Sequence, residues 1–195
     1  MHLKRSEMPK TWPVARKGTK YLTVASHSKR VGIPVLFALR ELLKVARTRK
    51  EVIYMVHNKE IKLNGKIIHD DKIPMQISDV LGIDKMGKNY RLEIKQGKFI
   101  LLEVSEKDAE KKITKIIGKK TLGKNKIQIN LSDGRNFIVK ENFSVGDSAL
   151  VNLKENKIEK ILRLKEGAKI EIISGKHVGQ EGEIKKEKIL VREKR

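Results

Sequence analysis

A cluster of basic residues between positions 47 and 66 has the composition of a phosphate-binding surface. Guanidinium and ammonium groups bind phosphate oxygens through charged hydrogen bonds, and a helix N-terminus adds backbone N–H donors. Contacts of this kind hold a nucleic-acid backbone without reading its bases. Any single member could equally be a solvated surface charge, so the function is assigned to the cluster as a whole. Its basic members are Arg47, Arg49, Lys50, Lys59, Lys62 and Lys66.

Two helices and a hairpin are expected to bring this cluster together. Apolar residues recur at helical spacing after Pro34, which predicts a helix that ends near Thr48. Thr48 and Glu51 have the spacing of a capping box, so a second helix should begin there. Asn64-Gly65 lies between two β-prone runs, residues 60–63 and 66–68, and predicts a type I′ hairpin. The apolar face of the first helix consists of Val35, Leu36, Leu39, Leu42, Leu43 and Ala46.

The net charge of the chain indicates a polyanionic partner. The 195 residues include 45 Lys and Arg against 24 Asp and Glu, so the formal charge is +21 at pH 7. Residues 1–50 alone hold thirteen basic and two acidic side chains. A membrane-binding helix would need a continuous apolar face opposite these charges, and residues 1–32 have no such period. Nucleic acid is therefore the expected partner, and neither a membrane nor a small-molecule substrate is expected.

Residues 1–33 are predicted to form an extended basic arm. Pro9, Pro13 and Gly18 interrupt any helical or strand pattern, so the arm should become ordered only when it binds RNA. A solubilising tail is the alternative, although the embedded Trp12 favours contacts. The arm residues expected to contact RNA are His2, Lys4, Arg5, Trp12, Arg16, Lys17, Lys20, Lys29 and Arg30.

The helix–helix–hairpin segment, residues 34–90, resembles a known RNA-binding module. Ala46-x-Thr48-Arg49, a short helix, and then Ile61-x-Leu63-Asn64-Gly65-Lys66 are similar to the module of the bacterial ribosomal protein S-four. The same module occurs in pseudouridine synthases and tyrosyl-tRNA synthetases, and Lys59 stands where it usually has glycine. The resemblance implies that the second helix and the hairpin edge cradle an RNA backbone. The contacts it implies come from Thr48, Arg49, Lys62, Asn64 and Lys66.

The remainder of the chain is expected to be rich in β-strands. Between residues 91 and 165, turn signals such as Gln96-Gly97 and Ser132-Asp133-Gly134 separate short β-prone runs, which predicts hairpins and a small barrel. A short helix within residues 108–120 is an alternative there. Residues 166–195 alternate around a glycine-rich loop and resemble the KOW motif of ribosomal and transcription-elongation proteins. This resemblance implies a small C-terminal β-barrel that presents Lys176 and His177 to RNA.

These segments together resemble one family over nearly the whole chain. His2-x-Lys4-Arg5 followed by Pro9-x-x-Trp12 is similar to the opening of the archaeal and eukaryotic ribosomal protein family S-four-e. That family has the same order of basic arm, S-four-like unit, central β domain and KOW unit. The resemblance implies an α+β protein whose domains are residues 1–33, 34–90, 91–165 and 166–195.

The functional expectation follows from the same resemblance. It implies a non-enzymatic constituent of the small ribosomal subunit in the cytoplasm, bound to small-subunit ribosomal RNA and to neighbouring ribosomal proteins. Such a constituent would support subunit assembly and translation. The alternative is a KOW-containing RNA-binding regulator of transcription or translation that does not reside on the ribosome.

No constellation of residues indicates catalysis, a metal or a cofactor. The chain has no cysteine, and its five histidines lack metal-ligand spacing. Gly82-x-x-x-x-Gly87-Lys88-Asn89 lacks the Ser or Thr hydroxyl that a P-loop needs for magnesium, so it is interpreted as a turn. Asp70-Asp71 follows a hairpin strand, where a solvated loop is the simpler interpretation. We therefore predict a binding protein with no catalytic residue, metal site or cofactor.

Overall fold

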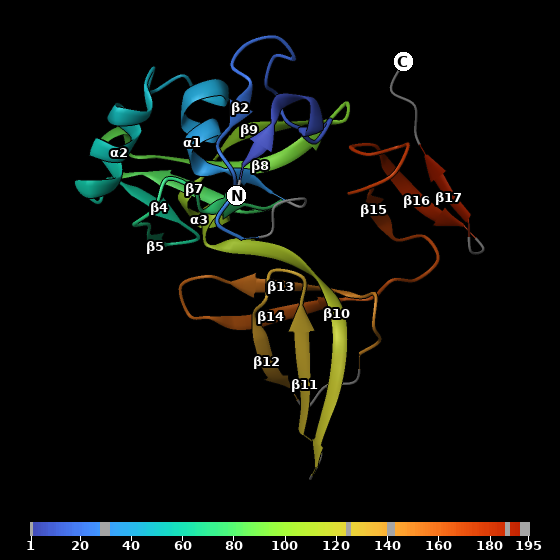
Figure 1. The fold of residues 1–195 in the computed structure, drawn as a ribbon. Coiled ribbons are helices and arrows are strands. Elements are labelled where there is room, and N and C mark those ends of the chain that lie inside the picture. Colours follow the sequence, from blue (N-terminus) through green and yellow to red (C-terminus); the bar gives the residue numbers. More distant parts are fainter. Residues whose placement is uncertain (1, 28–31, 124–125, 140–142, 186–187, 192–195) are drawn as a thin grey trace. The chain divides into compact units, whose positions relative to one another are not determined.

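The fold is mostly β, with a few short helices (Figure 1). The computed structural model describes residues 2–27, 32–123, 126–139, 143–185 and 188–191. The chain divides into two compact units, Met1–Ala109 with Ile172–Gln180, and Glu110–Glu171 with Glu181–Arg195. The expected α+β balance thus shifts towards strands, and the domain boundaries predicted at residues 33, 90 and 165 stay predictions.

An antiparallel sheet of five strands organises the first unit. Its strands are β4 (Ile61–Leu63), β5 (Lys66–Ile67), β7 (Val80–Ile83), β8 (Lys88–Lys95) and β9 (Lys98–Val104). The order across the sheet is β5-β4-β7-β8-β9, so the predicted hairpin β4–β5 continues into a larger surface. Asn64 and Gly65 have φ values of 52° and 76°, the left-handed conformations of a type I′ turn. Gly82 lies in β7 and Gly87 in the turn before β8, which is a hairpin and not a phosphate-binding loop.

The two predicted helices form, but the first is shorter than expected. α1 (Val35–Phe37) continues as a π-helical turn, η2 (Ala38–Leu42), and the chain then reverses at Lys44, whose φ is 55°. Ala46 belongs to the apolar pattern that predicted a longer helix, but it lies in a loop. It is apolar because it packs into the core, where it is 2% exposed. α2 (Arg49–His57) begins where the capping box predicted, since Thr48 Oγ1 accepts the N–H of Glu51.

Residues 2–27 pack onto the first unit, which corrects the expectation of an arm ordered only by RNA. Trp12 is 1% exposed, and its ring centroid lies 5.1 Å from that of Phe37. Lys98 Nζ donates hydrogen bonds to the backbone carbonyls of Lys10 and Trp12 at 2.6 and 3.3 Å. The apolar residues of the arm follow no period, yet Trp12 and Leu22 are buried in the core of the first unit. The arm contains β1 (Leu3–Lys4), η1 (Arg5–Glu7) and β2 (Tyr21–Leu22), with β1 paired to β2. A second short pair in the first unit joins β3 (Ile33–Pro34) to β6 (Pro74–Met75).

A second antiparallel sheet forms the body of the second unit. Its strands are β10 (Lys111–Gly123), β11 (Lys126–Leu131), β12 (Asn136–Val139), β13 (Ser148–Asn152) and β14 (Lys157–Leu162). The order β12-β11-β10-β13-β14 leaves β12 and β14 as the two edges of a curled half-barrel, so the sheet stays open among the described residues. The small barrel that was predicted is thus a half-barrel. Two further short helices are η3 (Asp84–Met86) and α3 (Glu106–Ala109), both in the first unit.

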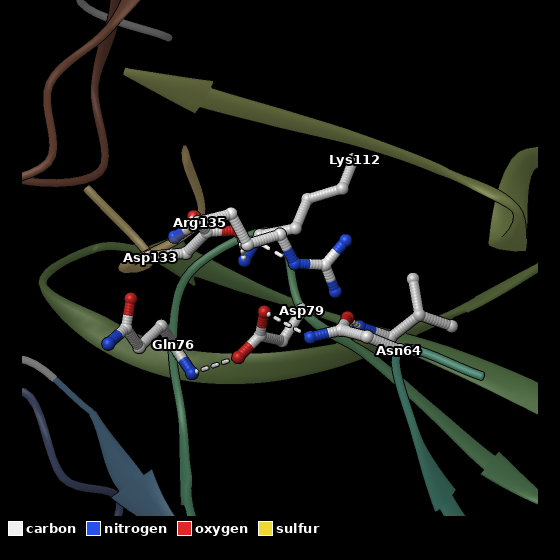
Figure 2. A network of polar contacts seen from close by, with 7 residues as sticks. Asn64, Gln76, Asp79, Lys112, Asp133 and Arg135 are labelled. Atoms are coloured by element: carbon white, nitrogen blue, oxygen red, sulfur yellow. Dashed lines mark hydrogen bonds and ion pairs between the residues drawn. The ribbon is translucent and has the colours of Figure 1, made fainter. Parts of the chain in front are cut away.

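The long strand β10 replaces the short helix that was an alternative for residues 108–120. Its inward face carries Lys112, which is 3% exposed and lies 3.2 Å from Asp133 Oδ2 (Figure 2). Asp133 also accepts the backbone N–H of Arg135 at 3.1 Å, and Arg135 Nε lies 3.6 Å from its carboxylate. The turn at residues 133–135 is therefore held to β10 by charge.

The C-terminal residues form a three-stranded antiparallel sheet with an inserted loop. Its strands are β15 (Lys169–Glu171), β16 (Glu181–Lys185) and β17 (Lys188–Val191). Loop 172–180 belongs to the first unit, where Val178 packs against the apolar core. Gly179 has a φ of 81°, and a Cβ there would lie 2.9 Å from the carbonyl oxygen of Ile94, so only glycine fits this approach. No helix in the described part of the chain is both long and apolar enough to span a membrane.

Replacing Lys59 with glycine should stabilise the first unit. Lys59 lies two residues after the end of α2 and has a φ of 59°, a conformation that costs an L residue about 1 kcal/mol and costs glycine almost nothing. Trp12, the only tryptophan, is buried in this unit, so its fluorescence reports the unfolding of that unit. We expect denaturant titration to show a gain of up to about 1 kcal/mol in unfolding free energy. Lys59→Ala keeps the Cβ, and an equal gain in that control would contradict the assignment to backbone strain.

Candidate nucleic-acid interface

The N-terminus of α2 is closed by its own side chains. Thr48 Oγ1 accepts a hydrogen bond from the N–H of Glu51 at 3.3 Å, and its hydroxyl donates a hydrogen bond to Glu51 Oε1 at 2.9 Å. The second carboxylate oxygen of Glu51 accepts the backbone N–H of Arg47 at 2.7 Å. These hydrogen bonds, chiefly the one from Arg47, hold the pKa of Glu51 below its usual value. Thr48, which was expected to contact RNA, is therefore a helix cap that bonds the Glu51 N–H.

Arg49 forms a bidentate ion pair with Asp71. Its Nε and Nη2 donate to the two carboxylate oxygens at 2.7 and 3.2 Å. Asp71 is 5% exposed, which corrects the solvated loop suggested for Asp70-Asp71. Burial by itself would raise the pKa of Asp71, but the hydrogen bonds and the charge of Arg49 outweigh it and lower that pKa. Arg49, which was expected to bind phosphate, thus anchors α2 to the segment after β5.

Asn64 is also an internal contact. Its Nδ2 donates to Asp79 Oδ1 at 2.8 Å, and its Oδ1 accepts the N–H of Val80 at 3.0 Å. The other carboxylate oxygen of Asp79 accepts the backbone N–H of Gln76 at 2.6 Å (Figure 2). Both ends of the Asn64 amide therefore fix the turn between β4 and β5, and the RNA contact of Asn64 stays a prediction.

The remaining cations of the predicted cluster lie at the surface. Arg47, Lys50, Lys59 and Lys66 are exposed. Lys62 is partly exposed, with its Nζ 2.7 Å from Asp84 Oδ2. An ion pair this open to water contributes little to stability. We refer to these five residues as the α2–hairpin cations.

The arm carries further cations around a loop that Arg5 closes. The Arg5 guanidinium donates to the carbonyl oxygen of Thr19 at 2.7 Å, to Thr19 Oγ1 at 3.0 Å and to the carbonyl oxygen of Ala15. His2 packs edge-on against Tyr21, with ring centroids 5.1 Å apart. Among the predicted arm contacts, Trp12 is buried, whereas Lys29 and Arg30 lie outside the described residues. Of the predicted arm contacts, Lys4, Arg16, Lys17 and Lys20 are exposed cations.

Loop 172–180 exposes the two residues that were predicted there. Lys176 and His177 are both exposed, and His177 Nδ1 lies 2.9 Å from Gln180 Oε1. Within the described residues, no three His, Asp or Glu side chains are placed to bind a metal ion. Sequence reasoning missed Tyr54, which is 65% exposed on α2. Helical spacing could have indicated its exposure, because Tyr54 lies on a different face of the helix from the apolar residues Val52 and Val56.

Comparisons with known proteins identify the family. A family model described as Ribosomal family S4e matches residues 86–158. The chain is 35% identical over 192 residues to the small ribosomal subunit protein eS4 of Methanosphaera stadtmanae, covering 96% of this chain and 80% of that protein. Its identity to the eS4 protein of Methanocella arvoryzae is 35% over 193 residues, covering 97% and 82%. The chain belongs to the S4e family of small-subunit ribosomal proteins.

A solved structure supports the S4e assignment. The crystal structure of the 30S ribosomal protein S4e from Thermoplasma acidophilum is similar to this chain, with a TM-score of 0.71 and 31% identity over 81% of this chain and 82% of that one. The resemblance to the S-four-e family is thereby confirmed, and with it the prediction of a structural, non-enzymatic ribosomal protein. The alternative of a KOW-containing regulator loses its basis, because the match extends far beyond the KOW segment.

Replacing Arg49 with alanine should destabilise the first unit. Loss of the guanidinium leaves Asp71 buried and unpaired, which costs about 1–3 kcal/mol of unfolding free energy. The pKa of Asp71 is lower in the folded chain than in the unfolded one, so its stabilising contribution is present above about pH 4 and is lost as the pH falls through the folded value. The difference between wild type and Arg49→Ala, measured by Trp12 fluorescence in denaturant, should therefore shrink at acidic pH.

The matched control for this experiment is Arg47→Ala. It removes an exposed guanidinium at the same end of α2 but keeps the backbone N–H that Glu51 accepts. If both variants lose the same stability at pH 7, Asp71 does not depend on Arg49 and the anchoring role is wrong.

Proposed function

We propose that the chain binds small-subunit ribosomal RNA in the cytoplasm, chiefly through phosphates, and thereby supports subunit assembly and translation. The observation that carries this proposal is the division of the predicted cluster. Arg49 is paired with a buried carboxylate, whereas in the described part of the chain no buried carboxylate pairs with the α2–hairpin cations beside it. Cations that no buried carboxylate holds are available to an external polyanion, and the net charge of +21 requires one.

The proposed contacts recognise the RNA backbone and its shape. Lysine and arginine side chains neutralise phosphates and release counterions, which makes binding strongly dependent on salt. Aromatic residues make up 4% of the chain, too few for an extended platform of stacked bases. The S-four-like unit at residues 34–90 would supply the α2–hairpin cations. The arm cations and the KOW loop with Lys176 and His177 would supply further contacts, and neighbouring ribosomal proteins would cover other surfaces.

Removing two α2–hairpin cations should flatten the salt dependence of RNA binding. For the double variant Lys50→Gln/Lys66→Gln, we expect the slope of log K against log salt, measured with small-subunit ribosomal RNA, to fall by roughly two units, one for each phosphate contact. Lys154→Gln/Lys157→Gln has the same change in charge, at residues that lie 3.5 and 3.7 Å from glutamate oxygens. If the two double variants behave alike, binding follows net charge alone and the proposed surface is wrong.

Residence on the small subunit is tested by sedimentation of a tagged chain from a cell lysate. We expect it to move with small subunits at low and moderate salt, and sequencing of the associated RNA should return small-subunit ribosomal RNA. Recovery with RNA polymerase, or with scattered messenger RNAs and no subunit peak, would contradict the proposal.

A further inference from the structure

A hollow beside α2 combines an exposed aromatic ring with apolar walls. Its volume is about 430 Å³, and it is lined by Val45, Ala46, Lys50, Glu51, Tyr54 and Met55. Tyr54 is 65% exposed and Val45 is 37% exposed. Val52 and Val56 bury the opposite face of the helix, so Tyr54 adds little to the core. A large ring held open to water on a rigid helix is typical of a contact surface.

The charges around this hollow favour an anionic occupant. Lys50 lies one helical turn before Tyr54, and Lys44 and Arg47 flank the lining residues Val45 and Ala46 in the chain. All three cations are exposed, and among the described residues neither Lys44 nor Lys50 forms an ion pair. The carboxylate in the lining, Glu51, is held by the Arg47 N–H and the Thr48 hydroxyl. The rim therefore offers positive charge beside an aromatic face.

We propose that this hollow binds one unstacked nucleobase of the RNA, with the base on the ring of Tyr54 and an adjacent phosphate on Lys50. A nucleotide is the ligand that presents a flat ring and a negative charge a few ångströms apart, and base–aromatic stacking beside cations is a general mode of single-strand binding. An apolar side chain of a protein partner would fill the hollow but leave the surrounding cations without an anion. The inference rests on the proposed RNA binding and adds to it a contact with a base.

The test compares two single-stranded RNA probes of equal length and charge. One is a mixed-sequence 12-mer carrying 4-thiouridine, and the other is its abasic counterpart. Tyr54→Leu keeps an apolar side chain without the ring, and Tyr54→Phe keeps the ring without the hydroxyl. We expect Tyr54→Leu to lose about tenfold in affinity for the base-containing probe and nothing for the abasic one, while Tyr54→Phe binds both as the wild type does. The photocrosslink of the wild type should map to the peptide that contains Tyr54.

The outcomes separate this site from the function on which it rests. If Tyr54→Leu binds both probes as the wild type does, the base site is wrong and a protein side chain becomes the occupant to seek, while phosphate binding stands. An equal loss for both probes also overturns the base site, because stacking cannot act on an abasic strand. A wild-type chain that binds neither probe nor ribosomal RNA overturns the proposed function itself. Trp12 fluorescence shows in each case whether the variant is folded.

Discussion

Buried aspartates are the interactions on which both units depend. Asp71 and Asp79 lie in the first unit and Asp133 and Asp147 in the second, and each is almost completely shielded from water. A carboxylate in that position is stable only when donors surround it. Each of the four accepts a hydrogen bond from a residue 15–22 positions away, so each ties together segments that are separate in sequence. The apolar cores contain most of the buried side chains. The buried carboxylates connect specific loops to specific strands and helices through hydrogen bonds.

The same carboxylates determine which cations remain for function. Lys112 is buried opposite Asp133, and Arg49 is paired with the buried Asp71 although its own side chain is 47% exposed. The neighbouring lysines and arginines have no such partner inside and stay at the surface, where their mutual repulsion is relieved only by a polyanion. A chain of this composition therefore divides its positive charge between its own stability and its partner.

Local patterns predicted local structure, and distant contacts account for the differences. The capping box at Thr48 and the turn at Asn64-Gly65 depend on residues within a few positions, so spacing alone was sufficient. β10 was missed because Lys112 and Thr114 face inward while Ile113 is 52% exposed, which inverts the pattern that indicates a half-buried strand. The pairing of Lys112 with Asp133 explains the inversion, and no local rule contains it. The packing of Trp12 and the pairing of Arg49 were missed for the same reason, since Phe37 and Asp71 are distant in sequence.

The discontinuity of the first unit has a consequence for the order in which the chain folds during synthesis. Domains generally fold from the N-terminal side as translation proceeds. Residues 1–109 are complete before loop 172–180 leaves the ribosome, so Ile94 lacks its contact with Gly179 until residues 110–171 have been made. Throughout that interval the nascent first unit exposes the apolar patch on which Val178 will rest. A protein that belongs to the translation machinery thus completes its first unit only after the strands of the central sheet have been translated.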